Sequence, residues 1–334
     1  MAKGFGADLE SQVQSMRARM QFGRMDGVEL VETNPRLAQL GRSLRGIGPE
    51  SDPELFRHFP VAAVAVAVLE SHFKATVASI IDAGSPYLER GLALAKDRLK
   101  SAIDVVPLLH RKAVTIGEVV AHVIPFNSVS SLEATFSALF DADIKTLVAD
   151  ARDPYHLRNG NESATNPMVV SVKDLWRELA LAFERRHILA HEAATKFELS
   201  FDDAKAAVDS CAEFVNALDA VMWSTIWKDL PLTQYEMNVE AWSRCKAERR
   251  ALAADIWAAL AVATESGERA RFRELHAEWK AFNKRWLAWE DEPFVMGSIR
   301  PLIAASARER TLRARREAIR GWLSLMRPEL TPDV

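Results

Sequence analysis

Residue types that define several other classes of protein are scarce in this chain. Its 334 residues include only two cysteines, Cys211 and Cys245, so no disulfide framework is expected and a reducing compartment is favoured. The 14 glycines and 14 prolines are few for this length, which argues against a turn-rich β architecture. The formal net charge is −3, so the chain as a whole is not expected to bind nucleic acid non-specifically.

Long hydrophobic runs are also missing from the sequence. The longest unbroken apolar run, residues 61–69, is far too short to span a bilayer, and Glu70 and His72 close it. Residues 1–22 are polar and mixed in charge, without the apolar stretch of a signal peptide. We therefore expect a cytoplasmic protein with no membrane partner.

Helical patterns dominate what the sequence does contain. Hydrophobic residues make up 49% of the chain, which is ample for a core. Apolar residues recur at helical spacing through residues 60–82, and a second apolar stripe runs through residues 200–228. We predict an all-α fold, with a helical bundle followed by a helical hairpin. The expected divisions are a partly helical lead-in at residues 1–57, a main domain at 58–230 and a C-terminal domain at 231–334.

One polar loop is expected within the main domain. Residues 149–167 form the longest polar stretch and carry His156 and Arg158. Loops beside a rigid helix often carry substrate contacts, so these two residues are candidates for substrate binding. The alternative is that both are simply solvated at the surface.

Titratable and cationic side chains are most concentrated in residues 183–192, Phe-Glu-Arg-Arg-His-Ile-Leu-Ala-His-Glu. This segment has no glycine or proline and follows an amphipathic stretch, so it is expected to be helical. On a helix, His187 and His191 share a face, and Arg186 points about 140° away from His191. A guanidinium can clamp a phosphate, and an imidazole can move protons near neutral pH. These groups on a packed helix suit phosphodiester chemistry.

Two other interpretations of the segment stay open. It can be the solvated polar face of an ordinary core helix. His187 and His191, with Glu192 beside them, also have a spacing that can hold zinc. A zincin needs a glutamate directly after the first histidine, and Ile188 stands there instead.

Arg186-x4-His191, with the polar residue His187 directly after the arginine, resembles the Arg-x4-6-His signature of HEPN domains. A long apolar helix that carries Glu70 precedes the motif, as in the ribonuclease-type HEPN subfamily. The resemblance covers roughly residues 55–230. It implies an all-helical module of the kind found in prokaryotic toxins and defence proteins.

The resemblance implies a metal-independent endoribonuclease of the toxin or defence type, with no cofactor, that leaves 2′,3′-cyclic phosphate ends. It implies RNA as the substrate and a homodimer that brings two motifs into one cleft. It also admits a cognate antitoxin or another protein partner. The alternative is a non-catalytic HEPN scaffold that binds RNA or a partner protein.

Roles for individual residues follow from the same resemblance. His191 would be the general base on the ribose 2′-hydroxyl or the acid on the leaving oxygen, and Arg186 would neutralise the developing phosphorane charge. His187 would position the substrate or Arg186. The predicted substrate-binding residues are Arg185, Glu70, His156 and Arg158.

Tryptophans and arginines gather in residues 233–334. The layout of residues 233–238, 279–289 and 297–299 is similar to the lysozyme-inhibitor LprI-like domain. That family is typically exported and uses cysteines, whereas only Cys245 is present here, so the resemblance implies a fold and not an activity.

Two expectations follow for this region. The tryptophans are expected to form the core of a helical hairpin, although tryptophan and arginine together also suit an interaction surface or stacking on bases. The final helix is the most basic part of the chain and is the best candidate for an RNA-backbone patch. Its arginines are Arg308, Arg310, Arg313, Arg315, Arg316 and Arg320.

Overall fold

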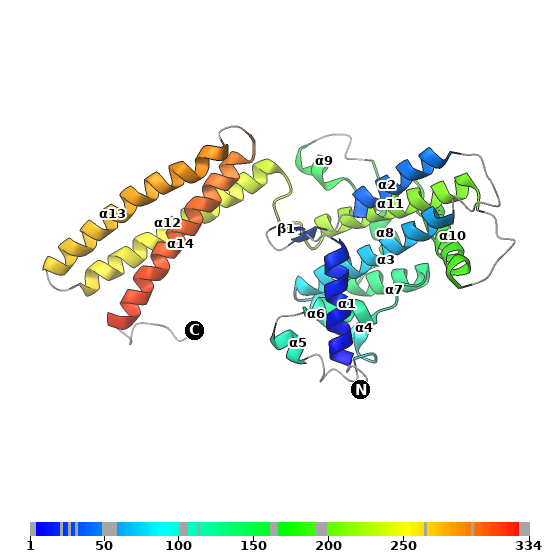
Figure 1. The fold of residues 1–334 in the computed structure, drawn as a ribbon, viewed down its shortest axis with the longest axis horizontal. Coiled ribbons are helices and arrows are strands. Elements are labelled where there is room, and N and C mark those ends of the chain that lie inside the picture. Colours follow the sequence, from blue (N-terminus) through cyan, green and yellow to red (C-terminus); the bar gives the residue numbers. More distant parts are fainter. Residues whose placement is uncertain are drawn as a thin grey trace. The chain divides into compact units, whose positions relative to one another are not determined.

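A computed structural model of the chain (Figure 1) describes residues 5–20, 23–25, 28–30, 33–48, 59–99, 106–111, 114–160, 166–191, 199–263, 266–294 and 297–326. The chain divides into two compact units, Met1–Lys228 and Asp229–Val334. The prediction of an all-α fold is confirmed. The strands within the described residues are β1 (Gly23–Met25) and β2 (Val28–Leu30), which form one small antiparallel hairpin.

The first unit is organised around α3 (Phe59–Asp82), which the sequence predicts at residues 60–82. Among the described residues this is the one helix that is long and apolar enough to cross a membrane. Most of it is buried inside the unit, and that burial accounts for its composition. The helices that pack against it are α2 (Thr33–Ile47), α4 (Tyr87–Ala95), α6 (Ile116–Val123), α10 (Val172–His191) and α11 (Phe201–Ser224).

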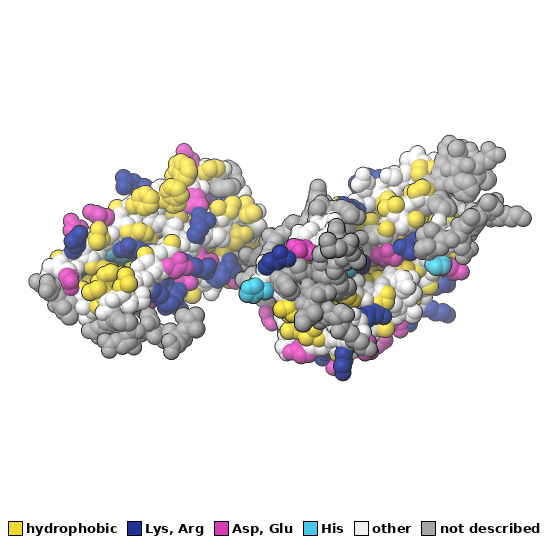
Figure 2. Space-filling view, turned by 60° about the horizontal axis from the view of Figure 1, so that its bottom comes forward, with side chains coloured by type: hydrophobic (Ala, Val, Ile, Leu, Met, Phe, Trp, Pro, Cys, Tyr) yellow, Lys and Arg dark blue, Asp and Glu magenta, His cyan; other side chains and the backbone are white. Residues whose placement is uncertain are grey.

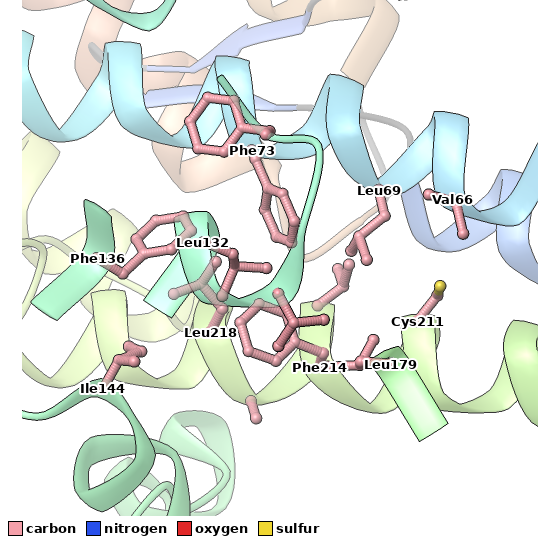
Figure 3. Packing of buried hydrophobic residues seen from close by; sticks show 14 of the residues in the cluster. Val66, Leu69, Phe73, Leu132, Phe136, Ile144, Leu179, Cys211, Phe214 and Leu218 are labelled. Carbon is pink, nitrogen blue, oxygen red and sulfur yellow. The ribbon is translucent and has the colours of Figure 1, made fainter. Parts of the chain in front are cut away.

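Phe73 of α3 lies in the middle of this core (Figure 3). Its ring centroid is 5.6 Å from that of Phe136, 5.6 Å from that of Phe214 and 5.8 Å from that of Phe126. Cys211 of α11 belongs to the same core, and burial raises the pKa of its thiol to about 12. Cys211 therefore behaves as a small core residue and not as a nucleophile.

A glycine lets α6 approach α3 closely. The backbone N–H of Gly117 donates to Asp82 at 2.9 Å, and a Cβ at this position would collide with the carbonyl oxygen of Ala78. A capping box formed by Thr115 and Glu118 fixes the start of α6. The contact and the cap together set the position of α6 beside α3.

The expected lead-in is part of the first unit. Leu37 and Leu44 of α2 are buried in the same core as α3. Leu9 and Val13 of α1 (Phe5–Met20) pack with Val119 of α6 in a smaller cluster. Only a few side chains of α1 and α2 are buried, and their partners lie on helices distant in the sequence, so this packing is not evident from the sequence.

Short helices also occupy places where a loop is expected. Residues 149–167 contain α9 (Pro154–Arg158), and Asp153 caps it by accepting the backbone N–H of Tyr155 and His156. An Asp-Pro pair thus starts a helix here and not a turn. The other helices of the first unit are α5 (Val106–His110), α7 (Val129–Phe140) and α8 (Ile144–Ala149).

The second unit consists of three long helices, α12 (Gln234–Val262), α13 (Ser266–Asp291) and α14 (Arg300–Met326). The short 3-10 helix η3 (Glu292–Phe294) follows α13. The main packing is between α12 and α14, and α13 packs against α14. Sequence periodicity was sufficient to place these helices because each is long.

The arginines of α14 are engaged inside the second unit. Arg316 donates to Glu248 at 2.6 Å and to Asp255 at 3.1 Å, and Arg320 donates to Asp255 at 2.9 Å. The remaining contacts are Arg313 with Glu309, Arg310 with Glu290, Arg308 over the ring of Trp242 and Arg315 over the ring of Trp279. Four of the six arginines are thus paired with acids of the same unit, and the RNA-backbone patch on this helix stays a prediction.

The tryptophans divide into two groups. Trp279 and Trp322 pack in the small core between the helices, as expected. Trp257, Trp286 and Trp289 are 74%, 42% and 63% exposed. The expectation of a tryptophan core is therefore wrong for these three side chains, and hydrophobic side chains are visible at the surface of this unit in Figure 2.

Candidate functional site

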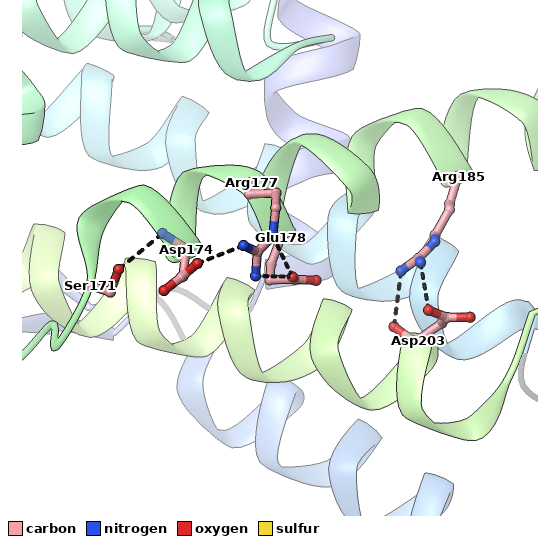
Figure 4. A network of polar contacts seen from close by, with 6 residues as sticks. All are labelled: Ser171, Asp174, Arg177, Glu178, Arg185 and Asp203. Carbon is pink, nitrogen blue, oxygen red and sulfur yellow. Dashed lines mark hydrogen bonds and ion pairs between the residues drawn. The ribbon is translucent and has the colours of Figure 1, made fainter.

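The helix α10 holds the predicted motif. Leu175, Leu179 and Phe183 face the core and are buried. On another face, Arg177 donates to Asp174 at 2.6 Å and to the neighbouring Glu178, as Figure 4 shows. The packed face fixes the rotation of the helix about its axis, and that rotation decides where each motif side chain points.

Arg186 points toward α3. Its Nη2 donates to Oε2 of Glu70 at 3.3 Å, and both side chains are partly buried. Burial raises the pKa of Glu70 above its usual value, while the charges of Arg186 and Lys74 act to lower it. The two predicted residues Arg186 and Glu70 are thus brought together from positions more than one hundred residues apart.

A cleft of about 750 Å³ opens beside this pair. Three of its lining side chains are cationic, namely Arg36, Lys74 and Arg186, and Glu70 is the single carboxylate among the lining residues. The other lining residues are Ser11, Gln12, Ser15, Ser71, His122, Val123, Ile124, Pro125, Phe126 and Asn127. Excess positive charge with several hydroxyl and amide donors suits an anionic ligand.

His122 is a titratable group in the cleft that sequence reasoning missed. It lies in the last turn of α6, and its ring nitrogen Nε2 is hydrogen-bonded to the side chain of Gln12. Burial lowers the pKa of His122, and the charge of Lys74 lowers it further. No local motif marks His122, Lys74 or Arg36, because the three come from three separate helices.

Arg185 does not line the cleft. It donates to Oδ1 of Asp203 at 2.6 Å and so connects α10 to α11 (Figure 4). Burial acts to raise the pKa of Asp203, but the hydrogen bond from Ser200 and the charge of Arg185 outweigh it, and the pKa is lowered. The structure therefore gives Arg185 a structural contact in place of the predicted phosphate contact.

His156 and Arg158 lie far from the motif. Arg158 donates to the carbonyl oxygen of Lys228 at 2.8 Å and lies over the ring of Trp223, near the C-terminal end of α11. Asp203, the partner of Arg185, lies at the other end of that helix. Twenty residues of helix separate Trp223 from Asp203, a distance of about 30 Å. The prediction that His156 and Arg158 contribute to one site with Arg186 is not supported.

The described part of the structure does not place the two motif histidines in the cleft. His187 is exposed on α10 and does not line the cleft. His191 is the last residue of α10, and its side chain lies outside the described residues, as do residues 192–198. Among the described residues, no group of three His, Cys, Asp or Glu side chains could hold a metal ion.

A second cavity of about 750 Å³ lies among the three helices of the second unit. Leu252, Ile256 and Leu287 are among its lining residues. The histidine there, His276, is stacked on Trp279 with ring centroids 5.4 Å apart. This cavity is also lined by cations, carboxylates and an imidazole, but by none of the predicted catalytic or substrate-binding residues. The first cleft is the better candidate because Arg186 and Glu70 meet in it.

Neither the family models, nor the curated proteins, nor the solved structures that were compared with this chain gave a match. The resemblances to HEPN and LprI-like domains therefore stay predictions that rest on the residues quoted for them.

Proposed function

We propose that this chain is a metal-independent endoribonuclease of the toxin or defence type, acting in the cytoplasm with Arg186 and His191 as its central catalytic residues. The observation that carries the proposal is the cleft beside Arg186. Three cations face one carboxylate there, and hydroxyl and amide donors surround them. A phosphodiester backbone is the polyanion that such a cleft would hold.

Arg186 is oriented for this role by its neighbour. Glu70 accepts one N–H of the guanidinium at 3.3 Å, and the group has further N–H donors with which to hold a phosphate. An arginine that is already oriented loses less conformational entropy when the ligand binds. Lys74 would then contact a neighbouring phosphate.

Cleavage would need two proton transfers. The ribose 2′-oxygen attacks phosphorus and loses its proton to a base, the bond from phosphorus to the 5′-oxygen breaks, and an acid protonates that oxygen. Burial keeps His122 in its neutral form, which can accept a proton. We assign the base role to His122 and the acid role to His191.

The proposal includes a homodimer. Arg186 and His191 are five positions apart in the sequence, and on an ideal helix that spacing separates two side chains by about 140°. The two groups of one chain therefore cannot both converge on one phosphate. A second copy across a twofold axis would bring His191 of one chain to the cleft of the other.

The experiment is a cleavage assay with the purified full chain, single-stranded RNA and EDTA. We expect products with 2′,3′-cyclic phosphate ends, and a loss of about 100-fold or more for Arg186→Ala, His191→Ala and His122→Ala. His110→Ala, on α5 and not among the residues that line the cleft, serves as the matched control and should cleave normally.

Two results would overturn the proposal. Cleavage that requires added zinc or manganese would return the His187 and His191 pair to consideration as metal ligands. RNA binding without cleavage, unchanged in the His122 and His191 variants, would identify the chain as a non-catalytic scaffold.

A further inference from the structure

The helix α13 carries an exposed apolar stripe. Leu275, Phe282, Trp286 and Trp289 are 50%, 55%, 42% and 63% exposed. Leu275, Phe282 and Trp289 are spaced by seven residues, and all four side chains fall within an arc of about 60° on the helix. Single exposed apolar residues are common, but a continuous stripe of three aromatic rings and a leucine indicates an interface.

The aromatic rings of the stripe pack against one another and remain exposed. The rings of Phe282 and Trp286 are stacked with centroids 6.2 Å apart, and those of Trp286 and Trp289 are 5.2 Å apart. Trp279 lies to one side of the stripe and packs in the small core of this unit. The core face and the stripe are thus two separate faces of α13.

Two side chains of opposite charge flank the stripe on the side away from Trp279. Glu278 lies four residues before Phe282, and Arg285 lies three residues after it. Neither has an ion-pair partner among the residues that the structure describes, in contrast to the arginines of α14. The face therefore has an apolar centre and one charge of each sign, placed almost symmetrically about its midpoint.

We propose that α13 pairs with α13 of a second copy of this chain, antiparallel, across a twofold axis between residues 281 and 282. In that register Glu278 lies opposite Arg285 of the second copy, and the twofold axis repeats this ion pair. Phe282 lies beside its own counterpart, and Leu275 comes close to Trp289 of the second copy. The face is complementary to itself in charge and in apolar spacing.

The charges select this arrangement over a parallel one. In a parallel, in-register pair, Glu278 would lie opposite Glu278, and Arg285 would lie opposite Arg285. Like charges in these flanking positions destabilise helix pairs, whereas opposite charges set partner choice and orientation. The antiparallel pair is the one that places Glu278 and Arg285 opposite charges of the other sign.

This interface uses none of the residues of the cleft. It would tether the first units of two chains to one another and so raise their local concentration. The ribonuclease proposal and the α13 interface can fail separately, because charge reversals on α13 leave Arg186, His122 and His191 in place.

The experiment measures the mass of the full chain in solution by sedimentation at micromolar concentration. We expect a dimer for the natural sequence. The single charge reversals Glu278→Arg and Arg285→Glu should each weaken association at least tenfold. Lys284→Glu reverses a charge on another face of α13 and should leave association unchanged.

Mixing the two reversed variants gives the sharper result. One chain then carries two arginines and the other carries two glutamates at positions 278 and 285, so the mixture should form a heterodimer although each variant alone is weakened. A misfolded variant could not be rescued in this way. Failure of the mixture to associate would overturn the proposed register.

A cross-linking experiment tests the midpoint independently. The natural Cys211 and Cys245 are buried, so a cysteine introduced by Phe282→Cys should be the reactive one and should form a disulfide with its counterpart on mild oxidation. Lys284→Cys should not. A monomeric natural chain, or cross-linking at position 284 as fast as at 282, would contradict the α13 interface.

Discussion

The two units of this protein use arginine and aromatic side chains in opposite ways. In the first unit the aromatic rings around Phe73 are buried, and Arg186 lines a cleft with an excess of positive charge. In the second unit most arginines of α14 are paired with acids, while Trp257 and Trp289 are exposed. A cluster of arginines in a sequence is therefore not in itself a basic surface. The position of the compensating acids decides that.

The same contrast appears in how the units are stabilised. The first unit has one large core in which helices distant in sequence meet on α3. The second has a small core, with Leu252 and Ile319 among its few buried members, supplemented by ion pairs between α12 and α14. Hydrophobic burial should therefore dominate the stability of the first unit and charge pairing should contribute more to that of the second.

The largest expected effect is on the core of the first unit. Phe73→Ala removes a ring that is fully buried among three other rings, so it should lower the free energy of unfolding by about 3–5 kcal/mol. Trp257→Ala removes a larger ring that is 74% exposed and should cost less than about 1 kcal/mol. Chemical denaturation followed by circular dichroism compares the two, and equal losses would break the contrast.

A loss of stability is also expected on acidification. Burial lowers the pKa of His72 to about 4, below the value of about 6.5 that it regains on unfolding. At His72 the unfolded chain then binds more protons between these values, so this site loses stability as the pH falls from about 6.5 toward 4, by at most about 3 kcal/mol. Asp219, whose Oδ1 lies 3.8 Å from His72, acts in the opposite direction, because burial raises its pKa to about 7. In His72→Asn this part of the pH dependence should be absent in denaturation curves measured across that range. A variant with the full acid slope would contradict the assignment.

A smaller effect is expected from the ion pairs of the second unit. Glu248→Gln removes the carboxylate that accepts from Arg316 at 2.6 Å, and both side chains are mostly buried, so a loss of about 1–3 kcal/mol is expected. Asp209→Asn, which breaks the exposed pair with Lys205, should cost less than about 1 kcal/mol. Thermal denaturation at low and high salt separates the two, and equal small losses would show that the paired arginines contribute little to stability.

Long, periodic segments were predictable from the sequence and short ones were not. The bounds of α3 and α11 follow from apolar spacing over many turns. The strands β1 and β2 are three residues each and carry no usable alternation. The helix α9 follows Asp153, whose side chain serves as a cap in a place where Asp-Pro suggests a turn.

Part of the candidate site was also predictable, because a local motif and a long helix mark two of its residues. Arg186 and Glu70 were proposed from a motif and from the helix that precedes it, and the structure brings them together. His122 and Lys74 contribute to the cleft only because α6 and α3 pack side by side. The partners of the α14 arginines lie about sixty residues earlier in the chain, where no local pattern connects them.

The most direct measurement compares two triple variants that each remove three positive charges. One removes Arg36, Lys74 and Arg186 from the cleft, and the other removes Arg308, Arg310 and Arg320 from α14, all by replacement with alanine. The affinity for single-stranded RNA is measured over a range of salt concentrations. We predict that the cleft variant loses affinity and that its salt slope falls by about 2, whereas the α14 variant keeps both. A normal slope in the cleft variant with a reduced slope in the α14 variant would contradict the account.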